Sequence, residues 1–135
     1  MNARARSLGM SDTRYRSASG LNDEGNHSSA RDQVILARHA LQEPLFAKVV
    51  GTRVKRVAWA PPTYEKEWVN LNELLGSYAG TYGVKTGYTS EAGHCLVAAV
   101  ERDGRSVIAV VLGSNSIWSD MRRLVDRAFA LQSRA

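Results

Sequence analysis

The residues best equipped for chemistry lie between Gly83 and Gly93, in a segment with the sequence GVKTGYTSEAG. Its centre, Lys85-Thr86-Gly87, places an ammonium, a hydroxyl and a stretch of backbone without a side chain in one row. An ammonium and a hydroxyl together bind a carboxylate through hydrogen bonds. The glycine leaves room for an extended peptide to lie against the backbone. The triplet therefore predicts a site for the anionic end of a peptide.

The C-terminal third of the chain predicts the sheet that positions this triplet. Residues 83–89, 94–101 and 106–112 are rich in β-branched and apolar side chains, and Asp103-Gly104 between the last two is a strong hairpin signal. We expect a three-strand antiparallel meander. Because the last two strands are almost continuously apolar, their sheet is expected to be covered on both faces and to form part of a larger sheet.

Helices are expected to cover this sheet. Residues 120–131 carry apolar side chains at the spacing of one helix face. Asp32 suits the first turn of an earlier helix, where a carboxylate favours the positive end of the helix dipole. The earlier helices are expected at residues 1–10, from a cap at Ser28 or Ser29 to about Gln42, and at residues 45–50 after Pro44.

The middle of the chain is less regular. Residues 52–59 alternate β-branched and basic residues, which predicts an exposed strand, and Pro61-Pro62 is expected to end it. Residues 70–75 are expected to form a helical turn, and residues 76–82 a loop.

The composition is that of one globular domain, expected to span residues 1–135. A hydrophobic content of 44% and a charged content of 23% are typical of a folded chain and not of a disordered one. The formal net charge of +5 is compatible with a solvated surface or with an anionic partner.

No apolar run is long enough to span a membrane, and no apolar stretch follows Arg4 and Arg6, so no signal peptide is expected. Cys95, the single cysteine, excludes an internal disulfide and is expected to be buried and inert.

Short motifs along the chain extend the pattern beyond the triplet. In order they are Met1-Asn2, Leu8-Gly9-Met10, Thr13, Gly20-Leu21, Ser29-Ala30-Arg31-Asp32, Asn70, Asn72, Leu74-Leu75, Tyr78, residues 83–89, Ala92-Gly93, Cys95-Leu96-Val97, Val110-Val111-Leu112-Gly113 and Leu124-Val125-Asp126. Together they resemble the C-terminal half of the catalytic domain of serine-type D-alanyl-D-alanine carboxypeptidases. These are low-molecular-mass penicillin-binding proteins that trim peptidoglycan stem peptides.

The resemblance implies a role for each residue of the triplet. In that family Ser-x-x-Lys supplies the nucleophile and its base, Ser-x-Asn supports proton transfer, and Lys-Thr-Gly lines the opposite wall of the cleft. Lys85 and Tyr88 are therefore the candidate catalytic residues, Lys85 beside the reacting serine and Tyr88 through its backbone N–H in the oxyanion hole. Lys85, Thr86 and Gly87 are the candidate substrate-binding residues. The expected ligands are stem peptides and β-lactams, with no cofactor and no metal.

The fold implied by the resemblance is a partial β-lactamase/transpeptidase-like fold of the α/β (α+β) class. It lacks the N-terminal strands and the nucleophile helix. No serine in the chain has a lysine three positions later, and neither Ser-x-Asn nor Tyr-x-Asn occurs; Ser119-Asp120-Met121 comes nearest. We therefore expect a chain that is inactive alone, unless a complementary N-terminal fragment supplies the serine. Intact members of the family work in the periplasm or cell envelope.

Plainer interpretations stay open beside these. Tyr88 serves equally well as a packing residue, and His94 is more typical of a structural histidine than of a cleft residue. Some members of the family carry an arginine after the Val-Leu-Gly strand, but neither Arg122 nor Arg123 aligns with it. The alternative function is a non-catalytic basic module, in which the ribbon at residues 52–59 binds an anionic wall polymer or nucleic acid. Nucleic acid is not the expected partner, and a non-functional remnant is the third possibility.

Overall fold

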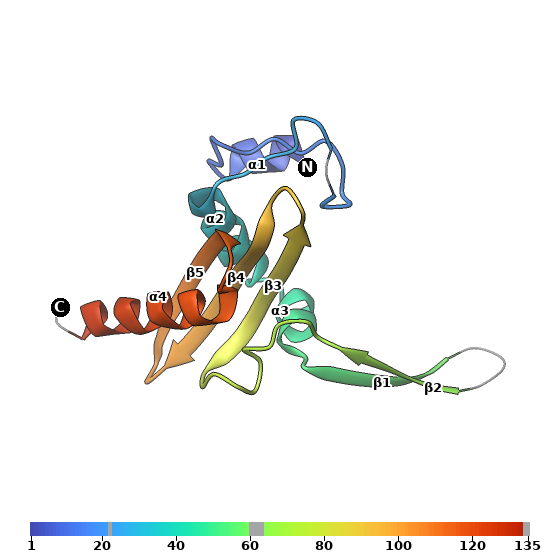
Figure 1. Ribbon diagram of the computed structural model, residues 1–135, viewed down its shortest axis with the longest axis vertical. Helices are drawn as coiled ribbons and strands as arrows, with labels where there is room; N and C mark the ends of the chain where they lie inside the picture. The colour runs from blue at the N-terminus through green and yellow to red at the C-terminus, as the bar shows by residue number, and fades with distance from the viewer. Residues whose placement is uncertain (22, 60–63, 134–135) are drawn as a thin grey trace.

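The computed structural model describes residues 1–21, 23–59 and 64–133. Three helices come first along these residues, five strands follow, and a last helix ends the described chain. Figure 1 shows a central sheet with helices packed against it and a ribbon extending to one side. The elements are α1 (Asn2–Ser7), α2 (Ala30–Ala40), α3 (Pro44–Gly51), β1 (Val54–Trp59), β2 (Tyr64–Val69), β3 (Thr81–Thr89), β4 (Gly93–Arg102), β5 (Arg105–Ser114) and α4 (Ile117–Gln132).

The central sheet is antiparallel throughout, with the strand order β3-β4-β5. Asp103 and Gly104 join β4 to β5 with φ angles of 51° and 72°. Two consecutive positive φ angles are what a type I′ hairpin turn requires, and Asp-Gly adopts them at low cost. The predicted meander is confirmed, and its strands are one or two residues longer at their ends than the apolar pattern indicated.

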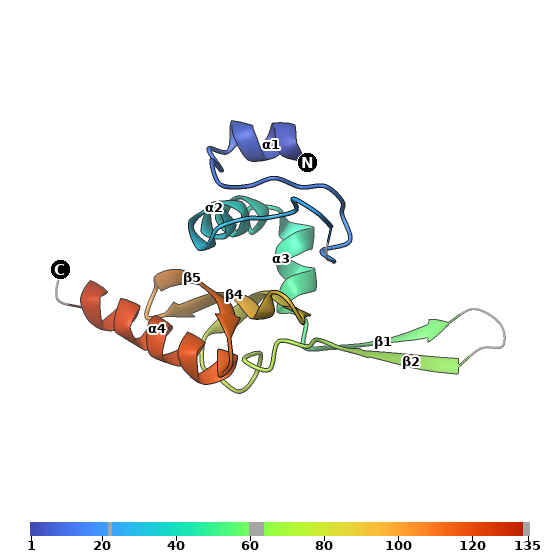
Figure 2. The ribbon, with the colours of Figure 1, turned by 45° about the horizontal axis from the view of Figure 1, so that its top comes forward.

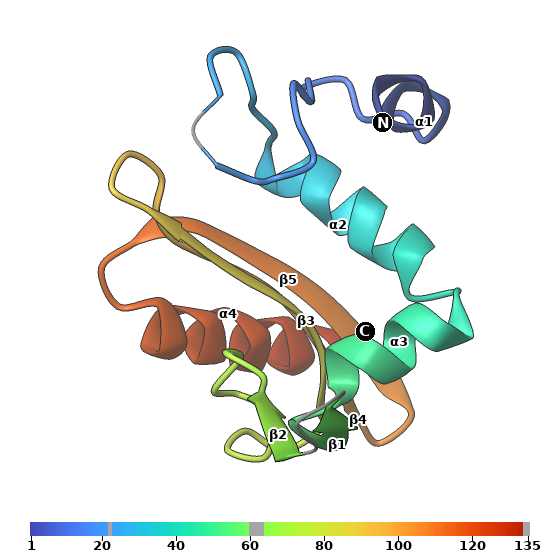
Figure 3. The same ribbon diagram turned by 90° about the vertical axis from the view of Figure 1, so that its right-hand side faces the viewer.

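Helices cover both faces of this sheet, as the apolar strands predicted (Figure 3). Because side chains alternate along a strand, successive residues of β4 enter two different cores. The core under α4 contains Leu74, Leu96, Ala98, Val100, Val107, Ala109, Ile117, Met121, Val125 and Phe129. The core under α2 and α3 contains Ala37, Val84 and Ala99, with Leu41, Val50, Tyr82, Val97 and Ile108 packed against it.

Helix α4 begins one turn earlier than its apolar pattern predicted. Met121, Val125 and Phe129 follow one another at intervals of four and are almost fully buried, so they form the face that packs on the sheet. Ser116 occupies the N-cap position without a capping hydrogen bond from its side chain. Ser116 is a residue type that favours the N-cap, so the sequence carried a signal for this earlier start that the apolar pattern alone did not use. None of the helices in the described part of the chain has the length and hydropathy that crossing a bilayer requires.

Asp32 fastens the N-terminal loop to α2. Ser29 is the N-cap of α2, one of the two predicted candidates, and its side chain accepts a hydrogen bond from the Asp32 N–H at 3.3 Å. The fully buried Asp32 carboxylate accepts hydrogen bonds from the Asp12 N–H at 2.8 Å and from the Thr13 hydroxyl at 2.7 Å. Burial by itself would raise the pKa of Asp32. The hydrogen bonds from Thr13 and Asp12 and the charge of Arg31 outweigh burial and hold this pKa below its ordinary value.

Strands β1 and β2 form a separate two-stranded antiparallel ribbon that projects away from the main sheet (Figures 1 and 2). Strand β1 was predicted, but β2 was not. Glu65, Lys66 and Glu67 are residue types that occur rarely in strands, and here they form one because β1 lies beside them. Pro61-Pro62, the predicted end of the first strand, lies outside the described residues.

The segment after the ribbon is a run of turns, where a helical turn was predicted for residues 70–75. Asn70 fixes its start, because its side-chain amide donates to the carbonyls of Val50 and Thr52, both at 3.2 Å. Tyr78 fixes its end by donating a 2.5 Å hydrogen bond to Asp126 of α4. The hydrogen bond from Tyr78, and then that from Arg102, lower the pKa of Asp126. The segment is thus held at both ends.

Met121→Ala and Leu124→Ala test the packing of α4. Met121 is fully buried whereas Leu124 is 40% exposed on the same helix, and alanine favours a helix at both positions. We expect Met121→Ala to lower the free energy of unfolding by about 2–5 kcal/mol. Leu124→Ala should lower it by about 1 kcal/mol or less. Urea denaturation followed by circular dichroism measures both, and equal losses would contradict the burial of this face.

Asp32→Asn tests the charged anchor of the N-terminal loop. Since the pKa of Asp32 is lowered in the fold, its ionised form contributes stability that is present above its ordinary value of 3.8. That contribution is lost as the pH falls through the lowered value. Urea denaturation at pH 7, 5, 4 and 3 measures the free energy of unfolding of the native chain and of Asp32→Asn. The difference between the two should be largest at neutral pH. The gap should narrow below about pH 4. Asp103→Asn, at an exposed turn, is the control. It should leave the pH dependence of the free energy of unfolding unchanged.

Candidate functional site

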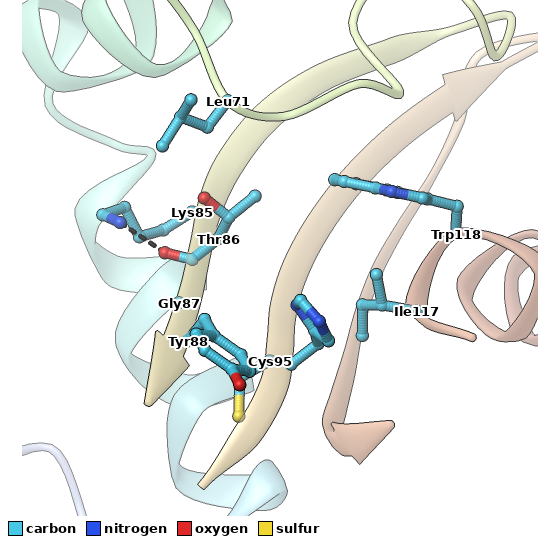
Figure 4. A pocket seen from close by; sticks show the side chains of 9 residues that line it. Leu71, Lys85, Thr86, Gly87, Tyr88, Cys95, Ile117 and Trp118 are labelled. Carbon is cyan, nitrogen blue, oxygen red and sulfur yellow. Dashed lines mark hydrogen bonds between the residues drawn. The ribbon is translucent and has the colours of Figure 1, made fainter. Parts of the chain in front are cut away.

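The four predicted site residues occupy consecutive positions on β3, which is an edge strand of the described sheet. They line a cavity of about 360 Å³, shown in Figure 4. Five more residues complete its wall: Leu71, His94, Cys95, Ile117 and Trp118. The structure therefore brings Lys85, Thr86, Gly87 and Tyr88 together on one wall, and the first turn of α4 provides the opposite side.

Lys85 gives this cavity its charge. Its side chain is exposed, and its ammonium donates a hydrogen bond to the carbonyl oxygen of Thr86 (Figure 4). None of the nine described residues that line the cavity carries a carboxylate. With no acidic neighbour in the wall, the positive charge of Lys85 is available to an anionic ligand. The Thr86 hydroxyl, one residue along the same strand, adds a neutral hydrogen-bonding group.

Gly87 is not required by packing within the described chain. A Cβ added at this position would meet no described atom within 4 Å, and Gly87 is not among the glycines with positive φ. Neither steric crowding nor backbone conformation therefore explains the absence of a side chain here. The space in front of the strand at this position is open in the described structure.

Tyr88 and His94 form a pair at the end of the cavity. They are opposite each other in the β3–β4 register, and their ring centroids are 4.5 Å apart with a tilt of 33°. Tyr88 is 64% exposed, so it borders the cavity and does not serve only as a packing residue. His94 likewise lines the cavity, although a purely structural histidine was the favoured interpretation.

Hydrogen bonds at the end of β5 hold the α4 side of the cavity in place. Asp120, in the first turn of α4, accepts a 2.5 Å hydrogen bond from the buried Ser114 hydroxyl and a 2.6 Å bond from Arg123. The bond from Ser114, and then that from Arg123, lower the pKa of Asp120 although burial acts in the opposite direction. The ionised Asp120 thereby fixes the turn that presents Ile117 and Trp118 to the cavity.

A second cavity of about 450 Å³ lies beside β3 and shares four residues with the first: Lys85, Thr86, Gly87 and Cys95. Its other walls come from the N-terminal loop, from α2 and from the sheet. They include Tyr15, Asn26, His27, Ser28, Gln33, Leu96, Val97 and Leu112. The triplet therefore borders two hollows, one toward α4 and one toward the N-terminal loop.

Sequence reasoning missed part of this wall. Cys95 was expected to be buried, but it is half-buried and borders both cavities, so that prediction was wrong. The hairpin carried a signal for it: strands that meet at the turn after Thr89 place Gly87 opposite Cys95. Trp118 packs on the core and also lines the cavity. Leu71 and Ile117 come from other parts of the chain, and no local pattern marked them.

The two arginines that did not align with the family pattern make contacts elsewhere. Arg122 donates to the Ser77 hydroxyl at 3.1 Å, and Arg123 is bonded to Asp120. Neither is among the residues that line the first cavity. Lys85 is therefore the cation of this wall.

The chain resembles known proteins over nearly its whole length. The peptidase S11 family model, described as D-alanyl-D-alanine carboxypeptidase, matches residues 1–116. The D-alanyl-D-alanine carboxypeptidase DacF of Bacillus subtilis is 39% identical over 134 residues, covering 96% of this chain and 34% of that protein. The D-alanyl-D-alanine carboxypeptidase of Streptomyces sp. strain K15 is 37% identical over 142 residues, covering 97% and 47%. The chain thus spans between a third and a half of the length of these relatives.

Solved structures show the same fold. The crystal structure of the Streptomyces K15 DD-transpeptidase superposes with a TM-score of 0.88 at 36% identity, covering 96% of this chain and 52% of that one. A penicillin-binding protein homolog from Mycobacterium tuberculosis superposes with a TM-score of 0.87 at 33% identity, covering 99% and 53%. The chain therefore has the antiparallel strands and flanking helices of about half of the penicillin-binding/transpeptidase fold.

Gly87→Ala and Gly80→Ala test whether the glycine of the triplet serves the fold. At Gly80 φ is +84° and a Cβ would lie 1.9 Å from the Glu101 carbonyl oxygen, so alanine there should be strongly destabilising. At Gly87 the space is open. We expect Gly87→Ala to leave the free energy of unfolding unchanged or to raise it by up to about 1 kcal/mol, because alanine restricts the unfolded chain. A large loss of stability in urea for Gly87→Ala would show that the glycine is structural.

Proposed function

The chain belongs to the peptidase S11 family of D-alanyl-D-alanine carboxypeptidases, and on that premise we propose that β3 forms the substrate-binding wall of a serine acyl-transfer cleft. The proposed substrates are peptidoglycan stem peptides ending in D-alanyl-D-alanine, and β-lactams are the proposed inhibitors. The observation that carries the proposal is the run from Lys85 to Gly87. It offers a cation without an acidic neighbour in its wall, a hydroxyl and an open backbone position in one cavity.

In this proposal Lys85 and Thr86 bind the carboxylate of the terminal D-alanine. The ammonium supplies charge and the hydroxyl supplies direction, because a hydroxyl hydrogen bond is more restricted in geometry than a point charge. Gly87 lets the peptide backbone approach β3. The peptide then lies as an additional strand along the open edge, where half of the N–H and C=O groups of β3 point away from β4.

The backbone N–H of Tyr88 is the proposed oxyanion donor of this wall. A serine hydroxyl attacks the carbonyl of the penultimate D-alanine, and the negative charge that develops on the oxygen is stabilised by preorganised N–H groups. D-Alanine leaves with the proton, and water then hydrolyses the acyl-enzyme. Lys85 lines the same cavity as Tyr88. In this proposal its charge stabilises the negative charge that develops on the substrate during both acylation and deacylation.

We place the reacting serine outside these 135 residues, since none of their serines is followed by lysine at the third position. In this proposal the 135 residues are one partial domain, inactive alone. The second cavity is the proposed seat of the nucleophile-bearing segment. It borders Lys85 and Gly87 and contains the apolar side chain of Leu112, which is 45% exposed. The cell envelope, where peptidoglycan is found, is the proposed place of action.

Complementation tests this function. The chain is mixed with an N-terminal family fragment that contains Ser-x-x-Lys and Ser-x-Asn, and D-alanine release from a peptide ending in D-Ala-D-Ala is measured. We expect release and covalent labelling of the fragment's serine by a fluorescent penicillin. Lys85→Gln should reduce the rate by about 100-fold or more. Lys48→Gln, the same change of charge at an exposed position of α3, should leave the rate unchanged.

Binding without catalysis provides a second measurement. Titration of the chain alone with N-acetyl-D-alanyl-D-alanine, followed by NMR, should shift the amide signals of residues 85–88. Lys85→Gln should abolish these shifts. Absence of shifts in the folded native chain, together with no release after mixing, would overturn the proposed role of β3.

A further inference from the structure

The ribbon formed by β1 and β2 has two chemically different faces. In an antiparallel pair, directly opposed residues point to the same side, and residues two apart along a strand share a face. Lys55 opposes Trp68 and Val57 opposes Lys66. Tyr64 lies two residues before Lys66 on the same strand and therefore shares its face. We call the set Lys55, Val57, Tyr64, Lys66 and Trp68 the lysine–aromatic face.

The opposite face is acidic overall. Arg56 forms an ion pair with Glu67 at 2.6 Å, and Glu65 lies two residues away on the same side. One arginine and two glutamates leave this face with a net negative charge, whereas the lysine–aromatic face carries two lysines and no acid among its described residues. The two faces of one ribbon thus differ in sign, and an anionic partner is attracted to one of them and repelled by the other.

The aromatic residues of the lysine–aromatic face are accessible. Tyr64 is 49% exposed and Trp68 is 51% exposed. The Lys66 ammonium lies 4.4 Å from the centroid of the Trp68 ring, so the charge and the aromatic surface are already side by side. Aromatic rings stack on sugar rings, because the polarised C–H bonds of a sugar meet the negative face of the ring. Lysines beside them suit carboxylates. This combination is complementary to a carbohydrate that carries acidic groups.

A hydrogen-bonded turn connects the ribbon to the wall of the cavity. Asn70 directly follows β2, donates to the carbonyls of Val50 and Thr52, and accepts a 2.9 Å hydrogen bond from the Asn72 N–H. Leu71, between these two asparagines, is 76% exposed and lines the cavity that contains Lys85. The base of the ribbon, which ends at Val69, is therefore two residues away from a residue of the cavity wall.

We propose that the lysine–aromatic face binds the glycan strand of peptidoglycan and positions its pendant stem peptides at β3. This inference rests on the proposed function of the cleft and adds a second binding surface to it. Sugar rings stack on Tyr64 and Trp68, and Lys55 and Lys66 pair with the carboxylates of the stem peptides. The ribbon projects away from the rest of the described chain (Figure 2), and both aromatic side chains of its lysine–aromatic face are about half exposed.

Co-sedimentation of the 135-residue chain with purified, insoluble peptidoglycan tests the proposal. Binding should weaken as salt rises, since the lysines contribute charge pairing. Trp68→Ala should weaken binding by about three- to tenfold, as expected for the loss of one aromatic stack. Lys55→Gln should weaken binding by about two- to fivefold, as expected for one exposed ion pair.

Matched controls are the sequence neighbours on the opposite face. Arg56→Gln makes the same change of charge one residue from Lys55, and Val69→Ala truncates an apolar residue beside Trp68. Both should change peptidoglycan binding by less than about twofold. Circular dichroism on all four variants verifies that each is folded. Equal losses of peptidoglycan affinity for the variants of both faces would overturn the proposal. So would an unchanged affinity for Trp68→Ala and Lys55→Gln.

Competitors separate the glycan from other anionic partners. Soluble glycan strands with stem peptides should displace the chain from insoluble peptidoglycan, whereas single-stranded DNA and anionic phospholipid vesicles at equal charge should not. Displacement by DNA or vesicles alone would assign the face to a different partner and overturn this one. The ribbon variants should leave N-acetyl-D-alanyl-D-alanine shifts at residues 85–88 unchanged. Failure of the ribbon is thereby distinguished from failure of the cleft.

Discussion

The site depends on β3 being paired along one side only. Its antiparallel register with β4 places Lys85 opposite Val97 and Gly87 opposite Cys95, and the other side of β3 has no strand beside it in the described residues. The hydrogen bonds between β3 and β4 hold the backbone of the triplet in place. The open side keeps the backbone groups that an extended peptide can use. A fully paired β3 would be equally rigid but would have no such groups available.

The rigidity of β3 comes from β4, the most deeply buried strand. Alternate residues of β4 enter two cores, so α4 holds it from one face while α2 and α3 hold it from the other. The α4 side of the cavity then depends on polar contacts: Ser114 and Asp120 fix the first turn of α4, and Asn70 and Tyr78 fix the turns that carry Leu71. The apolar layers set the position of the wall, and these hydrogen bonds set the shape of the cavity in front of it.

Sequence reasoning predicted what depends on neighbours in the chain. Strands β4 and β5, their Asp103-Gly104 turn and the apolar face of α4 follow from local periodicity and turn chemistry, and they were predicted closely. Strand β2 was missed because Glu65, Lys66 and Glu67 have little strand preference of their own and form a strand by pairing with β1. Leu71 and Ile117 were missed for a related reason. They reach the cavity through the packing of distant elements, and no periodicity within either segment records that contact.

The two proposed surfaces, the cleft and the lysine–aromatic face, bind one polymer more tightly together than either does alone. An exposed lysine that binds a carboxylate gains about 0.2–1 kcal/mol, so neither Lys85 nor the ribbon lysines alone hold a ligand tightly. A polymer that contacts both surfaces changes this, because occupying the ribbon converts the second contact into an intramolecular one at a high effective concentration. The gain is lost if the connection between the surfaces is loose. Asn70 keeps that connection short and hydrogen-bonded, with Leu71 one residue beyond it in the wall of the cavity. In the proposed function, weak individual contacts also let the glycan strand dissociate after D-alanine has been released from a stem peptide, which a single tight site would prevent.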